Sequence, residues 1–190
     1  MLDMGFTEAI DDIIGRIAKH HQTLLFSATY PDEIRAVSRR VQKNPVEVTV
    51  DAPVDEQPAI EQRFHEVEPA QKPDALAQLL SGAHAEHALV FCNMRREVDA
   101  VAQELDRRGF SALALHGDME QRDRDEVLVR FANRSCAVLV ATDVAARGLD
   151  IVALPLVVSY DIAHDPETHT HRIGRTGRAG QTGLAITLCT

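Results

Sequence analysis

Residues 60–190 alternate short apolar runs with helical stretches, and this alternation limits the fold more than any other feature of the chain. The strand-like runs are IEQRFHEV (60–67), HALVFC (87–92), SALAL (111–115), CAVLVAT (136–142), PLVVSY (155–160) and GLAITLC (183–189). The clearest helices are expected at 96–108, with Gly109 as a C-terminal stop, and at 121–133. Such alternation predicts an α/β fold with a parallel sheet and crossover helices.

The first fifty residues have a different organisation. Apolar spacing predicts a helix at 7–19, and Pro31 begins a second helix that ends near Gln42. QTLLFS (22–27) and VEVTV (46–50) are expected to be strands, with Leu24, Leu25 and Phe26 in a core.

A linker separates these residues from the regular pattern. Residues 51–59 contain two prolines and three acids and show no periodicity, which is typical of an extended, solvated segment. The expected organisation is therefore 1–50, a linker at 51–59, and a second domain at 60–190.

Composition excludes several classes of protein. No apolar run is long enough for a transmembrane helix, and the acidic N-terminal stretch does not resemble a secretory signal, so a cytoplasmic protein is expected. Three scattered cysteines predict buried thiols in a reducing compartment and no metal site. A net charge of −9 excludes a broadly basic nucleic-acid-binding surface.

Polar, glycine-bearing and arginine-bearing segments follow four of the predicted strands, and a fifth such segment leads into the last strand. They are NMRR (93–96), HGDMEQRDR (116–124), TDVAARGLD (142–150), YDIAHDPE (160–167) and HRIGRTGR (171–178). In parallel sheets, ligands bind outside the carboxyl ends of the strands. Because all five segments are expected at that edge, the sequence predicts one functional face there.

Several motifs resemble the later motifs of the DEAD-box RNA helicases in order and spacing. They are SAT (27–29), VFCN (90–93), HGDMEQRDR (116–124), ATDVAARGLDI (141–151) and HRIGRTGR (171–178). MLDMGF resembles the segment that follows the family's Asp-Glu-Ala-Asp motif, so the resemblance covers the whole chain. It is strongest to the bacterial DbpA group, whose members act on ribosomal RNA during large-subunit assembly.

The resemblance implies a RecA-like fold. Family members have two RecA-like domains that close on ATP and RNA. Residues 1–50 would be the end of the first domain, and residues 60–190 would be a RecA-like parallel sheet flanked by helices, the second helicase domain. The family often has Asn-Gly where this chain has Asn133-Arg134, and we expect Asn133 to take the left-handed helix end.

The resemblance also assigns residues to ATP. Arg175 and Arg178 would be arginine fingers that stabilise charge on the γ-phosphate. Asp150 would bind the ribose, and Gly148 would also contact the nucleotide. ATP and Mg²⁺ are the implied cofactors. The phosphate-binding lysine loop and the Asp-Glu-Ala-Asp motif are not in this sequence, so the Mg²⁺ ligands are expected in the missing part of the first domain.

RNA would bind through its backbone. The implied RNA-binding residues are Asn93, Arg95, Gly117, Gln121, Arg124, Thr142, Arg147 and Gly148. Ser27, Thr29 and His171 would couple the two domains. Simpler interpretations stay open for some of these: Asp150 as a turn residue, His171 as a structural histidine, and Ser27 and Thr29 as a strand end and a helix cap.

The expected function is therefore part of an ATP-dependent RNA helicase that unwinds short duplexes, with ribosomal RNA as partner and large-subunit assembly as process. An RNA-binding domain beyond Thr190 is also expected from the DbpA resemblance. Two alternatives stay open: a nonhydrolysing RNA- or protein-binding module on the same fold, and another superfamily 2 motor such as a DNA helicase.

Overall fold

The computed structural model describes residues 7–18, 20–27, 30, 32–50, 60–82, 87–146, 154–177 and 182–190. The chain divides into two compact units, Met1–Ala52 and Pro53–Thr190. The elements are α1 (Thr7–Arg16), α2 (Asp32–Val41), β1 (Ile60–Glu66), the 3-10 helix η3 (Pro69–Gln71), α3 (Lys72–Gly82), β2 (Ala88–Phe91), α4 (Arg95–Arg107), β3 (Ala112–Leu115), α5 (Gln121–Ala132), β4 (Val138–Ala141), α6 (Asp143–Ala146), β5 (Leu156–Ser159), α7 (Pro166–Ile173) and β6 (Gly183–Cys189).

The second unit is built on one six-stranded sheet in the order β1-β6-β5-β2-β4-β3, and every pair of neighbouring strands is parallel. This confirms the predicted parallel α/β architecture. The strand order reverses beside β2, because β3 and β4 lie on one side of it and β5 and β6 on the other. Crevices at such a reversal are the usual ligand sites of open parallel sheets.

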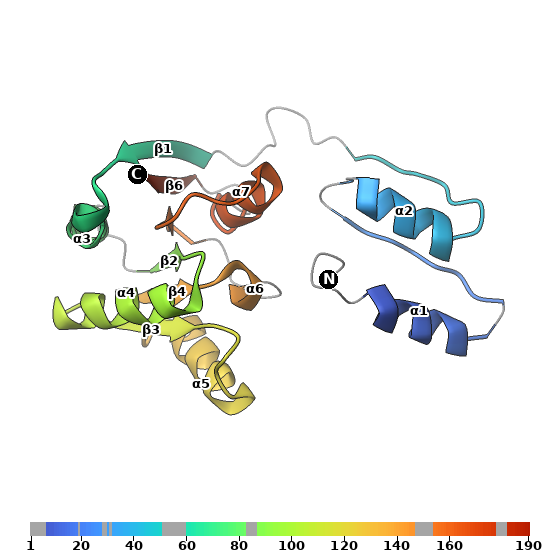
Figure 1. Cartoon of the computed structure of the whole chain (residues 1–190), viewed down its shortest axis with the longest axis horizontal. Helices are drawn as coiled ribbons and strands as arrows, with labels where there is room; N and C mark the ends of the chain where they lie inside the picture. Colours follow the sequence, from blue (N-terminus) through green and yellow to red (C-terminus); the bar gives the residue numbers. More distant parts are fainter. Residues whose placement is uncertain are drawn as a thin grey trace. The chain divides into compact units, whose positions relative to one another are not determined.

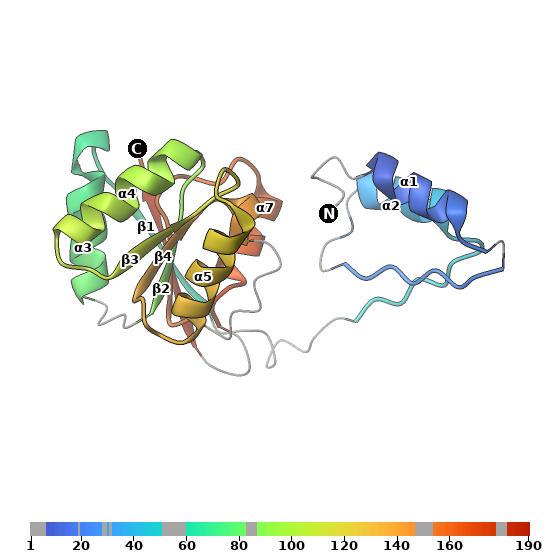
Figure 2. The same ribbon diagram turned by 90° about the horizontal axis from the view of Figure 1, so that it is seen from below.

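Helices cover both faces of this sheet, with α3 and α4 on one face and α5, α6 and α7 on the other (Figures 1 and 2). The central strands are buried on both faces, since side chains alternate along a strand. In β2, Val90 faces α3 and α4, whereas Leu89 and Phe91 face the other layer.

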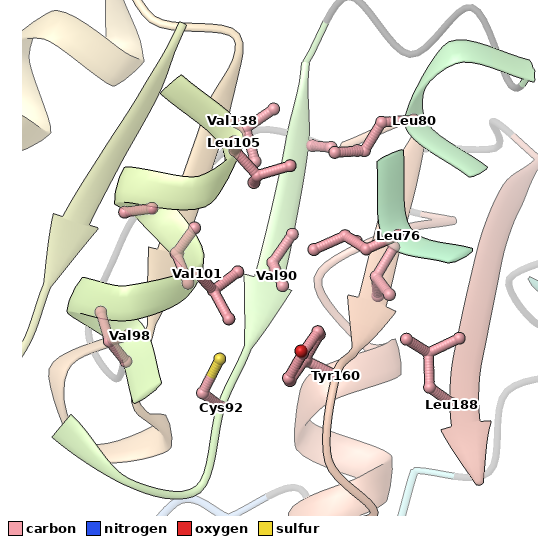
Figure 3. Close-up of a cluster of buried hydrophobic side chains, with 14 of the residues drawn as sticks. Leu76, Leu80, Val90, Cys92, Val98, Val101, Leu105, Val138, Tyr160 and Leu188 are labelled. Atoms are coloured by element: carbon pink, nitrogen blue, oxygen red, sulfur yellow. The ribbon is translucent and has the colours of Figure 1, made fainter. Parts of the chain in front are cut away.

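The core on the first face is closed by leucine and valine side chains of two helices. Figure 3 shows Leu76 of α3 and Val101 and Leu105 of α4 pointing towards Val90, with Cys92 and Tyr160 beside them. Burial raises the pKa of the Cys92 thiol and raises the pKa of Tyr160 to about 12, so both groups stay protonated at neutral pH.

The expectation of buried thiols is met by two of the three cysteines. Cys92 and Cys136 are buried and Cys189 is half-buried, and none of them forms a disulfide. In the described part of the chain, no helix is long and apolar enough to cross a membrane.

In the first unit, the two helices form but the two expected strands do not. The described residues at 22–27 and 46–50 have no strand structure. The expectation of a core at Leu24 and Phe26 is also wrong, since these side chains are 65% and 90% exposed. The physical reason is that strands need neighbouring strands and a packed layer, and this unit supplies too few of either.

The end of α5 corrects one further expectation. Arg134, not Asn133, takes the left-handed conformation, with φ of 59°. Asn133 has φ of −82° and ψ of 5°, and it closes the last helical turn as the C-cap.

Candidate functional site

The carboxyl ends of β5, β2, β4 and β3 lie next to one another along one edge of the sheet, and polar residues follow each strand. Asn93, Asp143 and Asp161 each come two residues after the last residue of a central strand. Because adjacent parallel strands end at the same edge, these three oxygen-bearing side chains converge there.

Arg172 of α7 joins all three of these loops. Its Nε and Nη2 donate to Asp143 Oδ1 and Oδ2 at 2.7 and 2.8 Å, so the two side chains form a bidentate ion pair. Nη1 donates to the Asp161 carbonyl at 2.6 Å, and Nη2 also donates to Asn93 Oδ1 at 2.7 Å. The guanidinium lies 5.3 Å from the centre of the Phe91 ring.

Arg172 is 0% exposed, so its charge is removed from water. A buried cation is stable only where an anion and further acceptors replace its hydration, and Asp143 and the two oxygens from the neighbouring loops do so here. The interaction fixes α7 against the loops after β2, β4 and β5. It therefore sets where His171 and residues 173–177 lie.

Arg172 is not among the site residues that the sequence predicts. The signal that could have found it is the repeated polar residue two positions after each central strand. Polar residues that converge at one edge favour a donor there, and Arg172 is an arginine of the helical stretch that comes before the glycine turn.

Asp161 anchors the loop after β5 from a second direction. Lys72 Nζ donates to Asp161 Oδ1 at 2.8 Å, and the backbone N–H of Asn93 donates to Oδ2 at 3.0 Å. Lys72 also lies 4.7 Å above the Tyr160 ring. The Asn93 amide donates to the Ile162 carbonyl at 3.0 Å, so both ends of the Asn93 side chain are engaged within the protein.

The loop after β3 carries a second polar cluster. His116 Nδ1 accepts the backbone N–H of Asp118 at 3.3 Å, which leaves Nε2 as the protonated nitrogen that donates to Asp99 Oδ1 at 3.0 Å. Arg95 in the first turn of α4 forms an ion pair with Asp118. A Cβ on Gly117 would lie 3.8 Å from the Arg95 guanidinium, so these two predicted RNA-binding residues are neighbours.

Two further predicted residues lie in the first turn of α5. Gln121 is exposed, and its amide donates to Asp125 at 2.7 Å. Arg124 is half-buried, and its Nε is buried without a hydrogen-bond partner among the described residues. Thr142 is engaged locally, because its hydroxyl accepts the Ala145 N–H at 3.4 Å.

Arg175 and His171 line a small pocket beside the buried pair. The lining residues are Phe91, Asp143, Ala146, Thr168, His171, Arg172 and Arg175. Both His171 and Arg175 are half-buried. The structure thus brings one predicted ATP-binding arginine and the predicted coupling histidine to the same end of α7.

The glycine-rich turn after α7 is fastened to the sheet. The Thr176 hydroxyl donates to the Leu154 carbonyl, and the two residues form an isolated parallel bridge. Gly177 has φ of 65°, a conformation that favours glycine. A Cβ on Gly183 would overlap Thr176 and the Gly177 nitrogen, so β6 packs directly against this turn.

Several predicted residues lie outside the described part of the chain: Thr29, Arg147, Gly148, Asp150 and Arg178. Ser27 is described and exposed, and it belongs to the first unit. Among the described residues, no group of three or more histidine, cysteine, aspartate or glutamate side chains could hold a metal ion.

Comparison with known proteins gives a consistent assignment. The model of the helicase conserved C-terminal domain matches residues 71–180. The chain is 56% identical over 189 residues to the ATP-dependent RNA helicase DbpA of Escherichia coli K12, and 47% identical over 190 residues to the DEAD-box ATP-dependent RNA helicase CshA of Geobacillus kaustophilus. The alignments cover 100% of this chain but only 41% of each relative.

Solved structures agree with this assignment. A Saccharomyces cerevisiae Dbp5 variant bound to RNA and ADP–BeF3 matches with a TM-score of 0.84 and 31% identity, over 97% of this chain and 49% of that one. A DEAD box protein from Methanococcus jannaschii matches with a TM-score of 0.67 and 37% identity, over 99% of this chain and 50% of that one. The chain therefore belongs to the DEAD-box RNA helicases and corresponds to the C-terminal part of their helicase core.

Proposed function

We propose that the whole protein is an ATP-dependent RNA helicase and that this chain supplies half of its ATP and RNA sites. The observation that carries the proposal is the buried Arg172. It locks α7, with His171 and Arg175, to the loops after β2, β4 and β5. A site built in this way holds its nucleotide-facing and RNA-facing residues in one rigid frame, as positioning of phosphoryl groups requires.

In this proposal, ATP is bound between two RecA-like domains. Arg175 and Arg178 stabilise charge on the γ-phosphate, while Asp150 and Gly148 contact the nucleotide. Mg²⁺ would neutralise phosphate charge. Because the described residues offer no metal-binding group, we assign no Mg²⁺ ligand within them. Residues 1–50 would belong to the first domain, 51–59 to the linker and 60–190 to the second domain.

RNA would cross the loops after β2, β3 and β4. Arg95, Gly117, Gln121 and Arg124 are exposed or half-buried and can meet phosphates. Asn93 has both ends of its side chain engaged, so we propose that it holds the Arg95 loop in place. Thr142, Arg147 and Gly148 complete the proposed grip. Phosphate contacts of this kind do not read base sequence.

Further parts of the proposal rest on the relatives alone. Ribosomal RNA as substrate, a function in large-subunit assembly, a cytoplasmic location and an additional RNA-binding domain after Thr190 come from the likeness to the DbpA group. Coupling between the domains through Ser27, Thr29 and His171 has the same basis.

Turnover kinetics of the full-length protein test this function. Arg178→Lys removes the planar guanidinium group but keeps the positive charge. The kcat for RNA-stimulated ATP hydrolysis should therefore fall about a thousandfold while ATP still binds. Arg107→Lys on the exposed side of α4 is the matched control and should leave kcat unchanged. An unchanged kcat in Arg178→Lys would refute the arginine finger.

The isolated 190-residue chain provides a second test. It contains no lysine phosphate loop and no Asp-Glu-Ala-Asp motif, so we expect no ATP hydrolysis with or without RNA. RNA-stimulated turnover by the purified chain would contradict the proposed division of the site. RNA binding by a full-length protein that hydrolyses no ATP would instead favour a nonhydrolysing binding module.

A further inference from the structure

Asp118 forms an ion pair with the guanidinium of Arg95. In the proposed function, this same guanidinium binds an RNA phosphate. The two side chains form an ion pair and are 61% and 60% exposed. A carboxylate and a phosphate are alternative partners for the same guanidinium fork. We propose that Asp118 is an internal competitor which RNA must displace from Arg95, and which thereby limits RNA affinity and speeds RNA release.

The surrounding contacts hold the competitor in place. His116 is buried and accepts the backbone N–H of Asp118 at 3.3 Å, while its other nitrogen donates to Asp99 of α4 at 3.0 Å. Arg95 begins the same helix. Both members of the ion pair are therefore fixed to α4, directly or through one imidazole, and the carboxylate faces the arginine before any RNA arrives.

Gly117 leaves the arginine accessible from one side. A Cβ at this position would be 3.8 Å from Cζ, Nε and Nη2 of Arg95. Without it, no side chain of residue 117 covers this side of the guanidinium. Among the described residues, Arg95 has no other acidic partner within ion-pair distance, so Asp118 is the carboxylate that a phosphate would replace.

The energetics of exposed ion pairs make the exchange feasible. Such pairs contribute little, because water screens both charges, so a phosphate can displace Asp118. RNA binding must then break the ion pair, and this cost weakens the binding. Removing the negative charge of Asp118 should therefore strengthen binding by about two- to fivefold.

The test measures RNA affinity by fluorescence anisotropy in the full-length protein, with a short labelled single-stranded RNA and a nonhydrolysable ATP analogue. Asp118→Asn keeps the size of the side chain and should lower Kd about two- to fivefold. In an Arg95→Met background, the same change should give no gain. Asp123→Asn, which removes another exposed carboxylate in the first turn of α5, is the matched control for net charge.

The outcomes separate this inference from the proposed function on which it rests. If Arg95→Met does not weaken RNA binding, the proposed RNA grip fails, and this inference fails with it. If Arg95→Met weakens binding but Asp118→Asn leaves Kd unchanged or raises it, only the competition is overturned. A gain from Asp118→Asn that persists without Arg95, or that Asp123→Asn reproduces, also overturns it.

Discussion

Arg172 and Asp143 form a bidentate ion pair with donor–acceptor distances of 2.7 and 2.8 Å. The arginine side chain is fully buried, and the aspartate side chain is 21% exposed. The pair connects the single helical turn after β4 to the last turn of α7. Because the same guanidinium also binds the loops after β2 and β5, one side chain connects the loops that follow three adjacent strands.

Removing this arginine should therefore be costly. Arg172→Met leaves the Asp143 carboxylate and two loop oxygens without their donor, so the free energy of unfolding should fall by about 3–5 kcal/mol. Urea unfolding followed by far-UV circular dichroism measures this loss. Arg107→Met, at an exposed i,i+3 pair with Glu104, is the control and should cost less than about 1 kcal/mol.

A double variant tests whether the loss of stability comes from the unpaired Asp143 carboxylate. Arg172→Met combined with Asp143→Leu removes the stranded charge, so it should recover part of the stability lost in the single variant. A double variant less stable than Arg172→Met alone would mean that Asp143 contributes to stability independently of the arginine.

The N-terminus of α7 should give the protein a pH-dependent stability. Asp165 is the N-cap, and its carboxylate accepts the Thr168 N–H at 2.7 Å and the Thr168 hydroxyl at 2.8 Å. The Thr168 backbone hydrogen bond, followed by the hydroxyl, lowers the pKa of Asp165. Asp165→Ala should cost about 0.5–2 kcal/mol at neutral pH, since the cap is lost.

The direction of the pH effect follows from the lowered pKa. The folded state holds the ionised form, so this stability is present above the unfolded pKa of about 3.9 and is lost as the pH falls further. Asp165→Asn keeps an acceptor without a charge. The difference in unfolding free energy between wild type and Asp165→Asn should therefore shrink between about pH 5 and pH 2. A difference that stays constant over this range would exclude the carboxylate as its source.

The fold of the second unit was predictable because its central strands are buried on both faces. The runs around Leu89 and Leu139 have no polar alternation, and such runs between helices occur almost only in parallel sheets. Pairing partners for every strand lie within residues 60–190. Local pattern and tertiary structure therefore agree there.

Prediction from local sequence pattern was wrong or incomplete where the structure depends on contacts between residues far apart in the chain. Val46, Val48 and Val50 have strong strand propensity but are 87%, 78% and 86% exposed, because propensity is effective only when other strands pair with it. Arg172 was missed for a related reason. Its partners come from three loops that lie far apart in the sequence and meet only at the edge of the folded sheet.

Hydrogen exchange tests whether residues 22–27 and 46–50 of the first unit lack strand structure. In the monomeric 190-residue chain, amides at 22–27 and 46–50 should exchange much faster than those of β2 and β4, because they form no strand ladder. Exchange as slow as in β2 would mean that these segments pair after all. Protection that appears only as protein concentration rises would identify pairing between two copies.

Two Schellman-type helix ends in the described part of the second unit differ in the residue that takes the left-handed conformation. At the end of α4, Phe110 N–H donates to Leu105 O at 3.0 Å and Gly109 N–H to Asp106 O at 2.9 Å. Gly109 has φ of 88°. At the end of α5, the same two hydrogen bonds run from Ser135 N–H to Arg130 O at 2.9 Å and from Arg134 N–H to Phe131 O at 3.0 Å.

The second of these helix ends has arginine where the first has glycine, and Arg134 has φ of 59°. A residue with a Cβ is destabilised in this left-handed conformation by about 1–2 kcal/mol. Arg134→Gly removes that strain but adds freedom to the unfolded chain, so it should raise the free energy of unfolding by about 0.5–1 kcal/mol. Gly109→Ala should lower it by a similar amount. Urea unfolding of both variants measures the two changes, and a loss of stability in Arg134→Gly would show that the arginine side chain contributes more than its backbone strain costs.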